Sequence, residues 1–386
     1  NSFAASTPAV DAERVYVNWI SGTTFIALAL DHTGKTIWRR EMGEFQARHG
    51  AGASPIVLGG LMIIGNDNKA TSFLAGLDGK TGDIVWQIVR DSKMTSYSTP
   101  AVYRPHDGPP EVIFVSEANG MTAVDPTNGQ TKWESEKLFT LKSVASPVVS
   151  GDTVIVLAGE SKRGAVRAYD LANGAPRWSA LPDKAGYSTP ALMNLAGVDQ
   201  LVVCTAKRVA GLNPDDGKVL WEQDYKVMMG LISSQPVQVS PDAFVVTGGY
   251  GAGTSRIELS RENGKLSARE AWNSHRLNAD FSTPVYHDGY LYGLDNGIFT
   301  CMDAETGERQ WKDGRFGFGQ VLLAGDKLLI SAEKGDLLVV AANPKELEVL
   351  HRFPAIRGKT LNTPAIAHGF LLMRNSEERV CYNLNL

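Results

Sequence analysis

Several short polar clusters in this chain have residue types that could do chemistry. The stretch LAGLDGKTGDIVW at 74–86 brings Asp, Lys, Thr and Gly into one turn, as many active-site loops do. The glycine-rich TGGYGAGTS at 247–255 lacks the Gly-Lys-Ser/Thr of a phosphate-binding P-loop and no helical pattern follows it, so we interpret it as a loop between strands. The triplet NDN at 66–68 has oxygen ligands for a cation, yet Lys69 beside it favours a solvated hairpin tip.

No catalytic or metal-binding set emerges from the remaining residues. The seven histidines are scattered and the nucleophile-elbow pattern GxSxG is absent. Cys204, Cys301 and Cys381 are far apart, without a CxxC motif or an adjacent pair, and each lies in an apolar strand-like run. We therefore expect three buried free thiols, no metal ligands and no catalytic residues.

The composition sets the broad class of the protein. The 386 residues are 43% hydrophobic and 21% charged, as in ordinary globular proteins, and no apolar run of about 18 residues could span a membrane. The net charge of -4 offers no general attraction to nucleic acid or anionic lipid. Nucleic acid and a membrane-embedded site are thus not expected.

The 74–86 stretch is one copy of a repeat. Related copies are TAVDPTNGQTKW at 122–133, RAYDLANGAPRW at 167–178, AGLNPDDGKVLW at 210–221 and TCMDAETGERQW at 300–311. In this pattern Asp78 can accept bonds from the amides that follow it, and Gly82 can take the positive φ of a tight turn between two strands. Recurrence in register indicates a structural joint rather than an active site.

Four short strands per repeat are expected. A Pro that follows Ser or Thr marks most repeat starts, and it returns every 43 to 48 residues between Pro8 and Pro284, with Gln235 before Pro236. An unmarked start is predicted near Gln320. A tryptophan ends most repeats and is predicted to dock between neighbouring blades, where it buries a large apolar area. These structural tryptophans are Trp38, Trp86, Trp133, Trp178, Trp221, Trp272 and Trp311; an eighth would fall near 351–353, where His351 and Phe353 stand.

The pattern A-x-D-x-x-T/N-G-x-x-x-W resembles the tryptophan-docking repeat of the PQQ-like β-propellers, a family that includes quinoprotein alcohol dehydrogenases and the outer-membrane assembly lipoprotein BamB. The resemblance covers essentially the whole chain. It implies an all-β fold, a single propeller domain over 1–386 built from four-stranded antiparallel blades. The chain has nine starts of a first strand but only eight ends of a fourth strand. Members of the family commonly have eight blades, so we expect eight, although a literal count of the repeats allows nine. The last blade, about 360–386, is expected to be incomplete and closed by a strand upstream of residue 1.

A binding surface is predicted where the fourth strand of one blade leads to the first strand of the next. These linkers carry more basic than acidic residues, which favours an anionic partner or ligand, although solvated loops with a chance surplus would look the same. Aromatic residues just before the repeat starts, Phe318 before the unmarked start near Gln320 among them, could form a rim or simply pack between blades. The candidate binding residues are Arg48, His49, Tyr97, Lys142, Tyr187, His275, Arg276 and Phe281.

The sequence favours a non-catalytic scaffold that binds a protein or an extended peptide on this rim, in an exported or periplasmic protein by family resemblance. No cofactor is expected under this interpretation. One alternative is a PQQ-dependent oxidoreductase with Ca²⁺ and a reduced active site, although the chain lacks the vicinal disulfide of the PQQ dehydrogenases and is much shorter. The other is recognition of a polysaccharide or small ligand in the channel.

Overall fold

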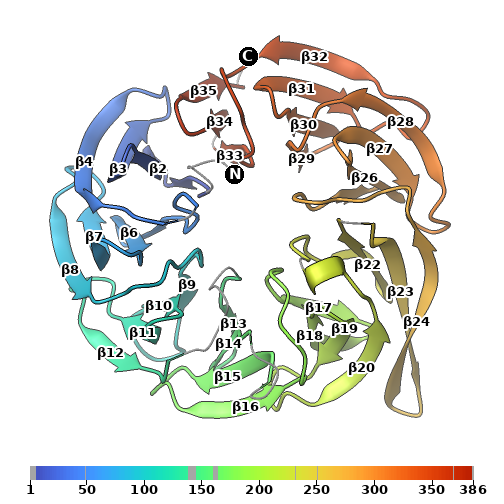
Figure 1. Ribbon diagram of the computed structural model, residues 1–386, viewed down its shortest axis with the longest axis horizontal. Coiled ribbons are helices and arrows are strands. Elements are labelled where there is room, and N and C mark those ends of the chain that lie inside the picture. Colours follow the sequence, from blue (N-terminus) through green and yellow to red (C-terminus); the bar gives the residue numbers. More distant parts are fainter. Residues whose placement is uncertain are drawn as a thin grey trace. The chain divides into compact units, whose positions relative to one another are not determined.

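The computed structural model describes residues 6–47, 49–137, 145–159, 164–230, 232–249, 251–367 and 369–384 (Figure 1). Among these residues the chain forms antiparallel sheets, one after another, and one short 3₁₀ helix, Met228–Gly230. The chain divides into two compact units. Unit 1 comprises Asn1–Val156, Tyr169–Pro176 and Ile356–Leu386, and unit 2 comprises Leu157–Ala168 and Arg177–Ala355.

Each sheet is a simple meander of consecutive strands, called a blade below. The first three blades belong to unit 1. Their strands are β1 (Ala9–Val10), β2 (Arg14–Ser21), β3 (Thr24–Asp31) and β4 (Thr36–Glu44); β5 (Ile56–Leu58), β6 (Leu61–Asn66), β7 (Ser72–Asp78) and β8 (Ile84–Arg90); and β9 (Ala101–Tyr103), β10 (Glu111–Ser116), β11 (Gly120–Val124) and β12 (Thr131–Glu134).

The next blades continue in chain order. They contain β13 (Val148–Ser150), β14 (Thr153–Leu157), β15 (Val166–Asp170) and β16 (Pro176–Ala180); β17 (Ala191–Leu195), β18 (Val198–Cys204), β19 (Arg208–Leu212) and β20 (Val219–Asp224); and β21 (Val237–Ser240), β22 (Ala243–Gly248), β23 (Gly253–Glu262) and β24 (Lys265–Ser274).

The last blades contain β25 (Val285–His287), β26 (Tyr290–Asp295), β27 (Ile298–Asp303) and β28 (Arg309–Arg315); β29 (Gln320–Ala324), β30 (Lys327–Ser331), β31 (Asp336–Ala341) and β32 (Val349–Pro354); and β33 (Ala365–Ala367), β34 (Phe370–Arg374) and β35 (Arg379–Asn383). The start predicted near Gln320 is confirmed by β29. His351 occupies the place of the repeat tryptophan in β32, opposite Val339.

The described residues thus form eight four-stranded sheets and one three-stranded sheet, the blades of a β-propeller. The all-β propeller prediction is confirmed, and so is the literal count of nine blades. The preference for eight was wrong, because it followed the habit of the family rather than the nine starts in this chain. In the last blade β35 is the outermost of the described strands.

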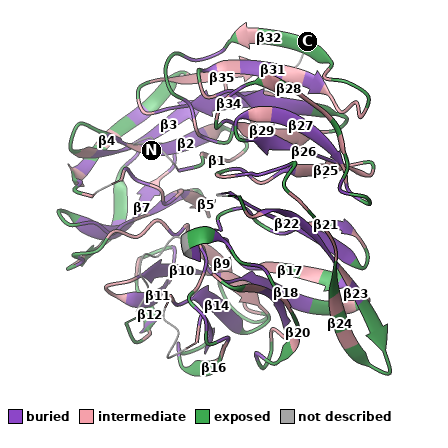
Figure 2. Ribbon diagram, turned by 45° about the vertical axis from the view of Figure 1, so that its right-hand side comes forward, coloured by how far each residue is buried: buried purple, intermediate pink, exposed green. Residues whose placement is uncertain are grey.

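The two middle strands of each blade form the core. Residues of β7 and β11 are almost all buried, whereas the outer strands β8 and β12 bury only their tryptophan (Figure 2, where β7, β11 and β12 are labelled). This division explains the unbroken apolar runs of the sequence, since a middle strand has neighbouring blades on both of its faces. Within unit 1, Tyr16 and Phe25 of the first blade pack in one cluster with Met62 and Phe73 of the second.

The recurrent turn has the predicted local chemistry. The Asp78 carboxylate accepts the amide protons of Lys80 at 2.8 Å and Thr81 at 2.9 Å, and the Gly82 amide donates to the Asp78 carbonyl at 2.8 Å. Gly82 has φ +76°, in the region that favours glycine. The turn joins β7 to β8 and presents its backbone to the preceding blade.

Most repeat tryptophans donate a hydrogen bond to the turn of the next blade. The donors and carbonyl acceptors are Trp38 and Gly79 at 2.9 Å, Trp86 and Pro126 at 2.7 Å, Trp133 and Leu171 at 2.6 Å, Trp178 and Pro214 at 3.2 Å, Trp272 and Glu305 at 2.9 Å, and Trp311 and Asn343 at 3.0 Å.

Trp221 is different, because its indole N–H donates to the side chain of Gln200 in its own blade. The next blade has no D-x-x-T-G turn at the equivalent place. Its hairpin β23–β24 is longer, with strands that run from Gly253 to Ser274, and β24 packs along the outer strand β20 (Figure 1). Trp221 is covered there by a cluster that includes Phe244, Ile257 and Leu259.

The first and last blades meet within unit 1. The buried Arg374 of β34 donates to the Asn18 carbonyl at 3.1 Å and to the hydroxyl of Ser6 at 2.7 Å. The rings of His32 and Phe370 stack with centroids 5.4 Å apart. Segments from the two ends of the described chain are therefore joined by polar and aromatic contacts.

Candidate binding surface

The starts of the first strands carry a chain of hydrogen bonds that sets the position of the linkers. In unit 1 the Thr7 amide donates to Ser54 Oγ at 2.8 Å, the Ser54 amide to Thr99 Oγ1 at 3.2 Å, and the Thr99 amide to Ser146 Oγ at 3.2 Å. The amide of Gln235 donates to Thr283 Oγ1 at 3.2 Å in unit 2. At these four motifs the hydroxyl thus accepts a hydrogen bond from the backbone of the preceding repeat start, and this contact fixes where the linker ends.

His49 and Tyr97 lie together in unit 1. Their ring centroids are 6.5 Å apart, with the planes tilted by 57°. Tyr97 lies against Gly52, where an added Cβ would come within 2.8 Å of the Tyr97 ring. Burial raises the pKa of the Tyr97 hydroxyl above its usual value. This pair is partly buried, in keeping with a packing role, and the candidates Arg48 and Lys142 lie outside the described residues.

Phe281 and Phe318 form an exposed aromatic pair in unit 2, on the linkers β24–β25 and β28–β29. Their ring centroids are 5.6 Å apart at an interplanar angle of 76°, an edge-to-face geometry. The side chains are 60% and 39% exposed. Phe281 thus contacts a ring from the next linker and still leaves more than half of its surface exposed.

The backbone around this aromatic pair is held by hydrogen bonds. Gln320 Nε2 donates to the Phe281 carbonyl at 3.3 Å, and the Phe318 amide donates to Glu333 Oε2 at 3.0 Å. The preceding linker joins the same set, since Ser233 Oγ donates to the Asp280 carbonyl at 3.0 Å. Three consecutive linkers are thus tied together, and the exposed rings are carried on a defined backbone.

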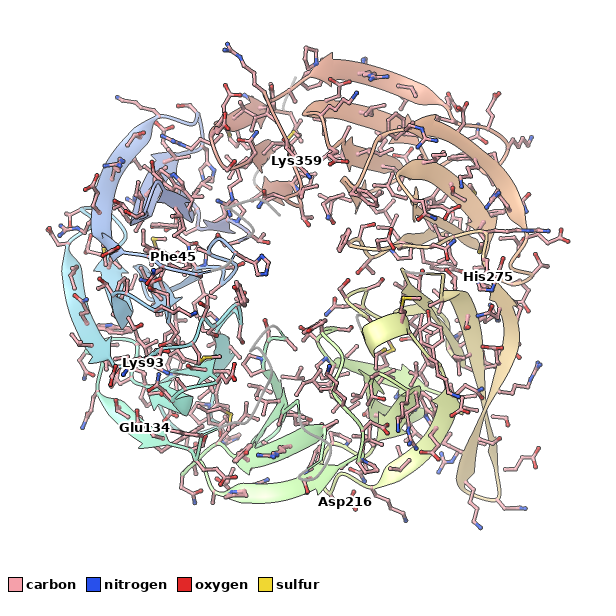
Figure 3. The ribbon with its side chains drawn as sticks, viewed as in Figure 1. Phe45, Lys93, Glu134, Asp216, His275 and Lys359 are labelled. Carbon is pink, nitrogen blue, oxygen red and sulfur yellow. The ribbon has the colours of Figure 1, made fainter. Side chains whose placement is uncertain are left out.

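His275 and Arg276 follow β24 in unit 2, and both side chains are exposed (Figure 3, where His275 is labelled). The Arg276 carbonyl accepts a bond of 2.7 Å from Arg309, which also donates to Asp295 at 3.3 Å. Asp295 is buried and contacts Lys312 at 2.5 Å. Burial alone would raise the pKa of Asp295, but hydrogen bonds from Lys312 and Asn278 outweigh it and hold the pKa below its ordinary value.

Tyr187 and Met228 belong to other linkers of unit 2. Tyr187 is partly buried, and its amide donates to the Ile232 carbonyl at 2.9 Å. Met228, which begins the 3₁₀ helix between β20 and β21, is 64% exposed. The sequence did not single out Met228, because sequence alone does not show whether an apolar linker residue is exposed or buried. Of the candidate residues, His49 thus contacts Tyr97 and Phe281 contacts Phe318, whereas Tyr187 is partly buried.

The NDN triplet at 66–68 is not a solvated hairpin tip. All three residues are buried; Asp67 pairs with Arg90 at 3.1 Å, and Asn68 Nδ2 donates to the Thr71 carbonyl at 2.7 Å. The prediction failed because Arg90, at the end of the fourth strand, folds back over the triplet. Burial raises the pKa of Asp67 despite the neighbouring Arg90.

Across the seven described stretches, no three His, Cys, Asp or Glu side chains gather closely enough to hold a metal ion. Cys204 and Cys301 are buried free thiols as predicted, whereas Cys381 is only partly buried. Cys381 lies on the third strand of the last blade, and that position has less cover than the middle strands of complete blades. No helix in the described part of the chain is long and apolar enough to cross a membrane.

The fold is that of a PQQ-like β-propeller, and its linkers carry exposed aromatic and basic side chains. The model of a family described as outer membrane protein assembly factor BamB matches residues 1–140 and, in a second match, 112–313, so the chain belongs to this family. No curated protein matches.

Solved structures agree in fold. BamB from Moraxella catarrhalis has a TM-score of 0.59 and 16% identity, with 88% of this chain and 98% of that chain covered. A europium-containing methanol dehydrogenase has a TM-score of 0.58 and 14% identity, with 97% and 84% covered. Quinohemoprotein alcohol dehydrogenase from Comamonas testosteroni has a TM-score of 0.58 and 14% identity, with 96% and 70% covered.

Proposed function

We propose that this protein is an exported binding scaffold that holds an extended segment of another protein on its linker surface. The exposed pair of Phe281 and Phe318 carries the proposal. Solvent-exposed aromatic side chains on a fixed backbone are favourable anchors, because they lose little conformational freedom on binding and bury a large apolar area. The membership in the BamB family supports a role in assembling outer-membrane proteins, and with it a periplasmic location.

The chemistry of the surface indicates which segment it would bind. The ring pair would accept an aliphatic or aromatic side chain of the partner. His275 and Arg276 are exposed on the same linker as Phe281 and would favour an acidic residue a few positions away in the partner. We therefore expect an extended peptide with one large apolar residue and nearby carboxylates.

The proposal is tested with a displayed library of extended peptides selected on the wild-type protein. Selected peptides are then measured by fluorescence polarisation against Phe281→Ala, Phe318→Ala and Arg276→Glu. Truncation of a hot-spot aromatic costs about 2 kcal/mol or more, so each Phe→Ala change should weaken binding at least about thirtyfold. Arg276→Glu should weaken mainly the acidic peptides, and more strongly at low salt.

A matched control is Val349→Ala, since Val349 is also an exposed apolar residue of unit 2 but lies on the outer strand β32. This change should leave peptide binding unaltered. Equal binding by all four variants would refute a role for the aromatic pair. Retention of added PQQ and Ca²⁺ together with dye-linked alcohol oxidation would replace the scaffold proposal by the oxidoreductase alternative.

A further inference from the structure

The last blade has three described strands where each of the other eight blades has four. Within the described part of the chain its sheet ends at β35, and every other strand already has a place in its own blade. A strand at the edge of a sheet presents backbone N–H and C=O groups that can pair with a further strand. The outer edge of β35 can therefore accept a strand from outside the described residues.

The strand pairing of a complete blade shows which residue of such a strand would face Cys381. In the seventh blade, one residue from each strand forms a row of directly opposed residues: Val285, Tyr292, Cys301 and Trp311. The same row in the last blade consists of Ala365, Leu372 and Cys381. A fourth strand would thus place the equivalent of the repeat tryptophan opposite Cys381. Since Cys301 faces Trp311, a cysteine at this place leaves room for an indole.

The first blade contains the turn on which such a tryptophan would dock. Asp31 Oδ1 accepts the amide protons of Thr33 and Lys35, at 2.9 Å each. Gly34 has φ +87°, and its amide donates to the Asp31 carbonyl at 2.9 Å. This turn has the same bonds as the one at Asp78, on which Trp38 docks.

No indole lies on the turn of the first blade. In five later turns the equivalent glycine lies against the tryptophan of the preceding blade: Gly82, Gly129, Gly174, Gly217 and Gly307. At Gly34 an added Cβ would instead meet Cys381 Cβ at 3.2 Å. The His32 carbonyl accepts a bond of 3.0 Å from the Cys381 thiol, whereas the corresponding Gly79 carbonyl accepts the indole N–H of Trp38. The thiol therefore occupies the hydrogen-bonding place of a tryptophan.

The charge at this edge favours a carboxylate beside that tryptophan. Arg379 precedes Cys381 by two residues on the same face of β35, and Arg374 of β34 lies directly opposite it. The Arg379 Nη2 donates to Thr36 Oγ1 at 3.2 Å, while its Nε is buried without a partner among the described residues. Burial lowers the pKa of Arg379 below its ordinary value, and the charge of nearby Arg39 lowers it further. An acidic side chain opposite Arg379 would complement this group of arginines.

The pairing register places that acidic residue two positions after the tryptophan. In the seventh blade Trp311 faces Cys301, and Asp313 faces Phe299. The position equivalent to Phe299 in the last blade is Arg379, two residues before Cys381. The complementary strand therefore has the pattern Trp-x-Asp or Trp-x-Glu.

From the register, the turn and the charge, we propose that the last blade takes its fourth strand from another polypeptide, in a segment with the pattern Trp-x-Asp/Glu. The strand pairs antiparallel with β35, its indole replaces the thiol at the His32 carbonyl, and its carboxylate contacts Arg379. It continues the tryptophan contacts that join the other blades. The linker surface consists of other residues, so this inference goes beyond the proposed function and does not depend on it.

A segment of the chain itself is a suitable probe. The peptide TGERQWKDGR has the sequence of residues 306–315, which include β28, and it has aspartate two residues after its tryptophan. Fluorescence polarisation measures its binding to the 386-residue protein. Alanine in place of the peptide tryptophan should weaken binding at least about thirtyfold, the loss expected for an anchoring aromatic.

Charge exchange tests the contact with Arg379. Lysine in place of the peptide aspartate should weaken binding to the wild-type protein, because it faces Arg379 with a like charge. Arg379→Gln should remove most of this difference between the two peptides. Arg104→Gln, at an exposed position of the third blade, is the matched control and should bind both peptides as the wild type does.

A disulfide tests the register directly. Directly opposed residues of antiparallel strands have Cα atoms about 4.5–5.5 Å apart, within the span of about 4.4–6.8 Å that a disulfide bridges. A peptide with cysteine in place of its tryptophan should therefore form a mixed disulfide with Cys381 under mild oxidation. Cysteine in place of the following lysine points to the opposite face and should not. The unmodified peptide should slow the labelling of Cys381 by a thiol reagent.

Three results would overturn the proposal. The first is a tryptophan peptide that neither binds nor protects Cys381, and the second is binding that is unchanged when alanine replaces the tryptophan. The third is an equal disulfide yield from the two cysteine peptides. Sedimentation velocity of the protein alone tests the source of the strand, since a dimer with protected Cys381 would assign this edge to a second copy instead.

Discussion

Trp38 Nε1 donates a hydrogen bond of 2.9 Å to the carbonyl oxygen of Gly79, in the turn of the following blade. The ring of the same indole lies on Gly82, where an added Cβ would come within 2.6 Å of a ring carbon. Trp86 has the same relation to Gly129, and Trp133 to Gly174. Glycine is therefore required in this turn for two reasons: it adopts the positive φ of the turn, and its missing side chain leaves room for the indole of the preceding blade.

Gly82→Ala should destabilise the protein more than Gly59→Ala. Both glycines have positive φ, +76° and +59°, which costs alanine about 1–2 kcal/mol. A Cβ at Gly59 meets no atom within 4 Å, whereas at Gly82 it displaces Trp38 and adds the roughly 1–3 kcal/mol of an overpacked site. Urea denaturation midpoints of the two variants test this ranking; equal midpoints would show that the indole does not need the glycine.

Gln200→Met should lower the free energy of unfolding, because it removes the only acceptor found for the Trp221 indole N–H among the described residues. The amide of Gln200 also donates to the Leu195 carbonyl at 3.1 Å. Buried groups left without a partner cost about 1–3 kcal/mol each. Gln310→Met, at an exposed position, is the control and should be nearly neutral. A similar loss in both variants would contradict the assignment.

Asp295→Asn should destabilise the protein at neutral pH and have less effect in acid. Lys312 and Asn278 hold the folded-state pKa of Asp295 below the unfolded value of about 3.9. A depressed acid pKa contributes stability above the unfolded pKa, and the contribution disappears as pH falls through the folded pKa. Unfolding of wild type and variant, compared from pH 7 down to about pH 3, measures the difference. A gap that widens in acid would have the wrong sign.

Cys381 should react with a thiol reagent before the other two cysteines. Burial raises the pKa of Cys204 to about 12, and it raises the pKa of Cys301 to about 12 as well. Both thiols are also buried, whereas Cys381 is only partly so. Native protein should therefore incorporate one label rapidly, and Cys381→Ser should abolish that step while the denatured variant labels at the remaining two. Rapid labelling of Cys381→Ser in the native state would contradict this order.

The turn and the blade could be predicted from the sequence because their determinants are local. Asp78 and Gly82 are close in the chain, and their bonds form within one hairpin. The same periodicity located the start at Gln320 without its proline and placed His351 where the tryptophan is missing.

Exposure of the candidate site could not be predicted in this way. Phe281 and Tyr97 precede the same Ser-Thr-Pro motif, yet Phe281 is 60% exposed whereas Tyr97 is partly buried against Gly52. The partner of each ring comes from a neighbouring linker: Phe318 lies 37 residues after Phe281 in the chain, and His49 lies 48 residues before Tyr97. The local sequence around a ring therefore does not show which distant residue covers it.

By itself the sequence determined the repeat, the propeller class and the turn between the third and fourth strands of a blade, because the residues that specify the turn are close in the chain and recur at fixed spacing. Only the tertiary structure decided that nine blades form, that Arg374 joins the last blade to Asn18 of the first, and that Trp221 turns to Gln200 instead of the following turn. These outcomes depend on packing between segments distant in the chain, where the burial of a side chain is set by its neighbours in space.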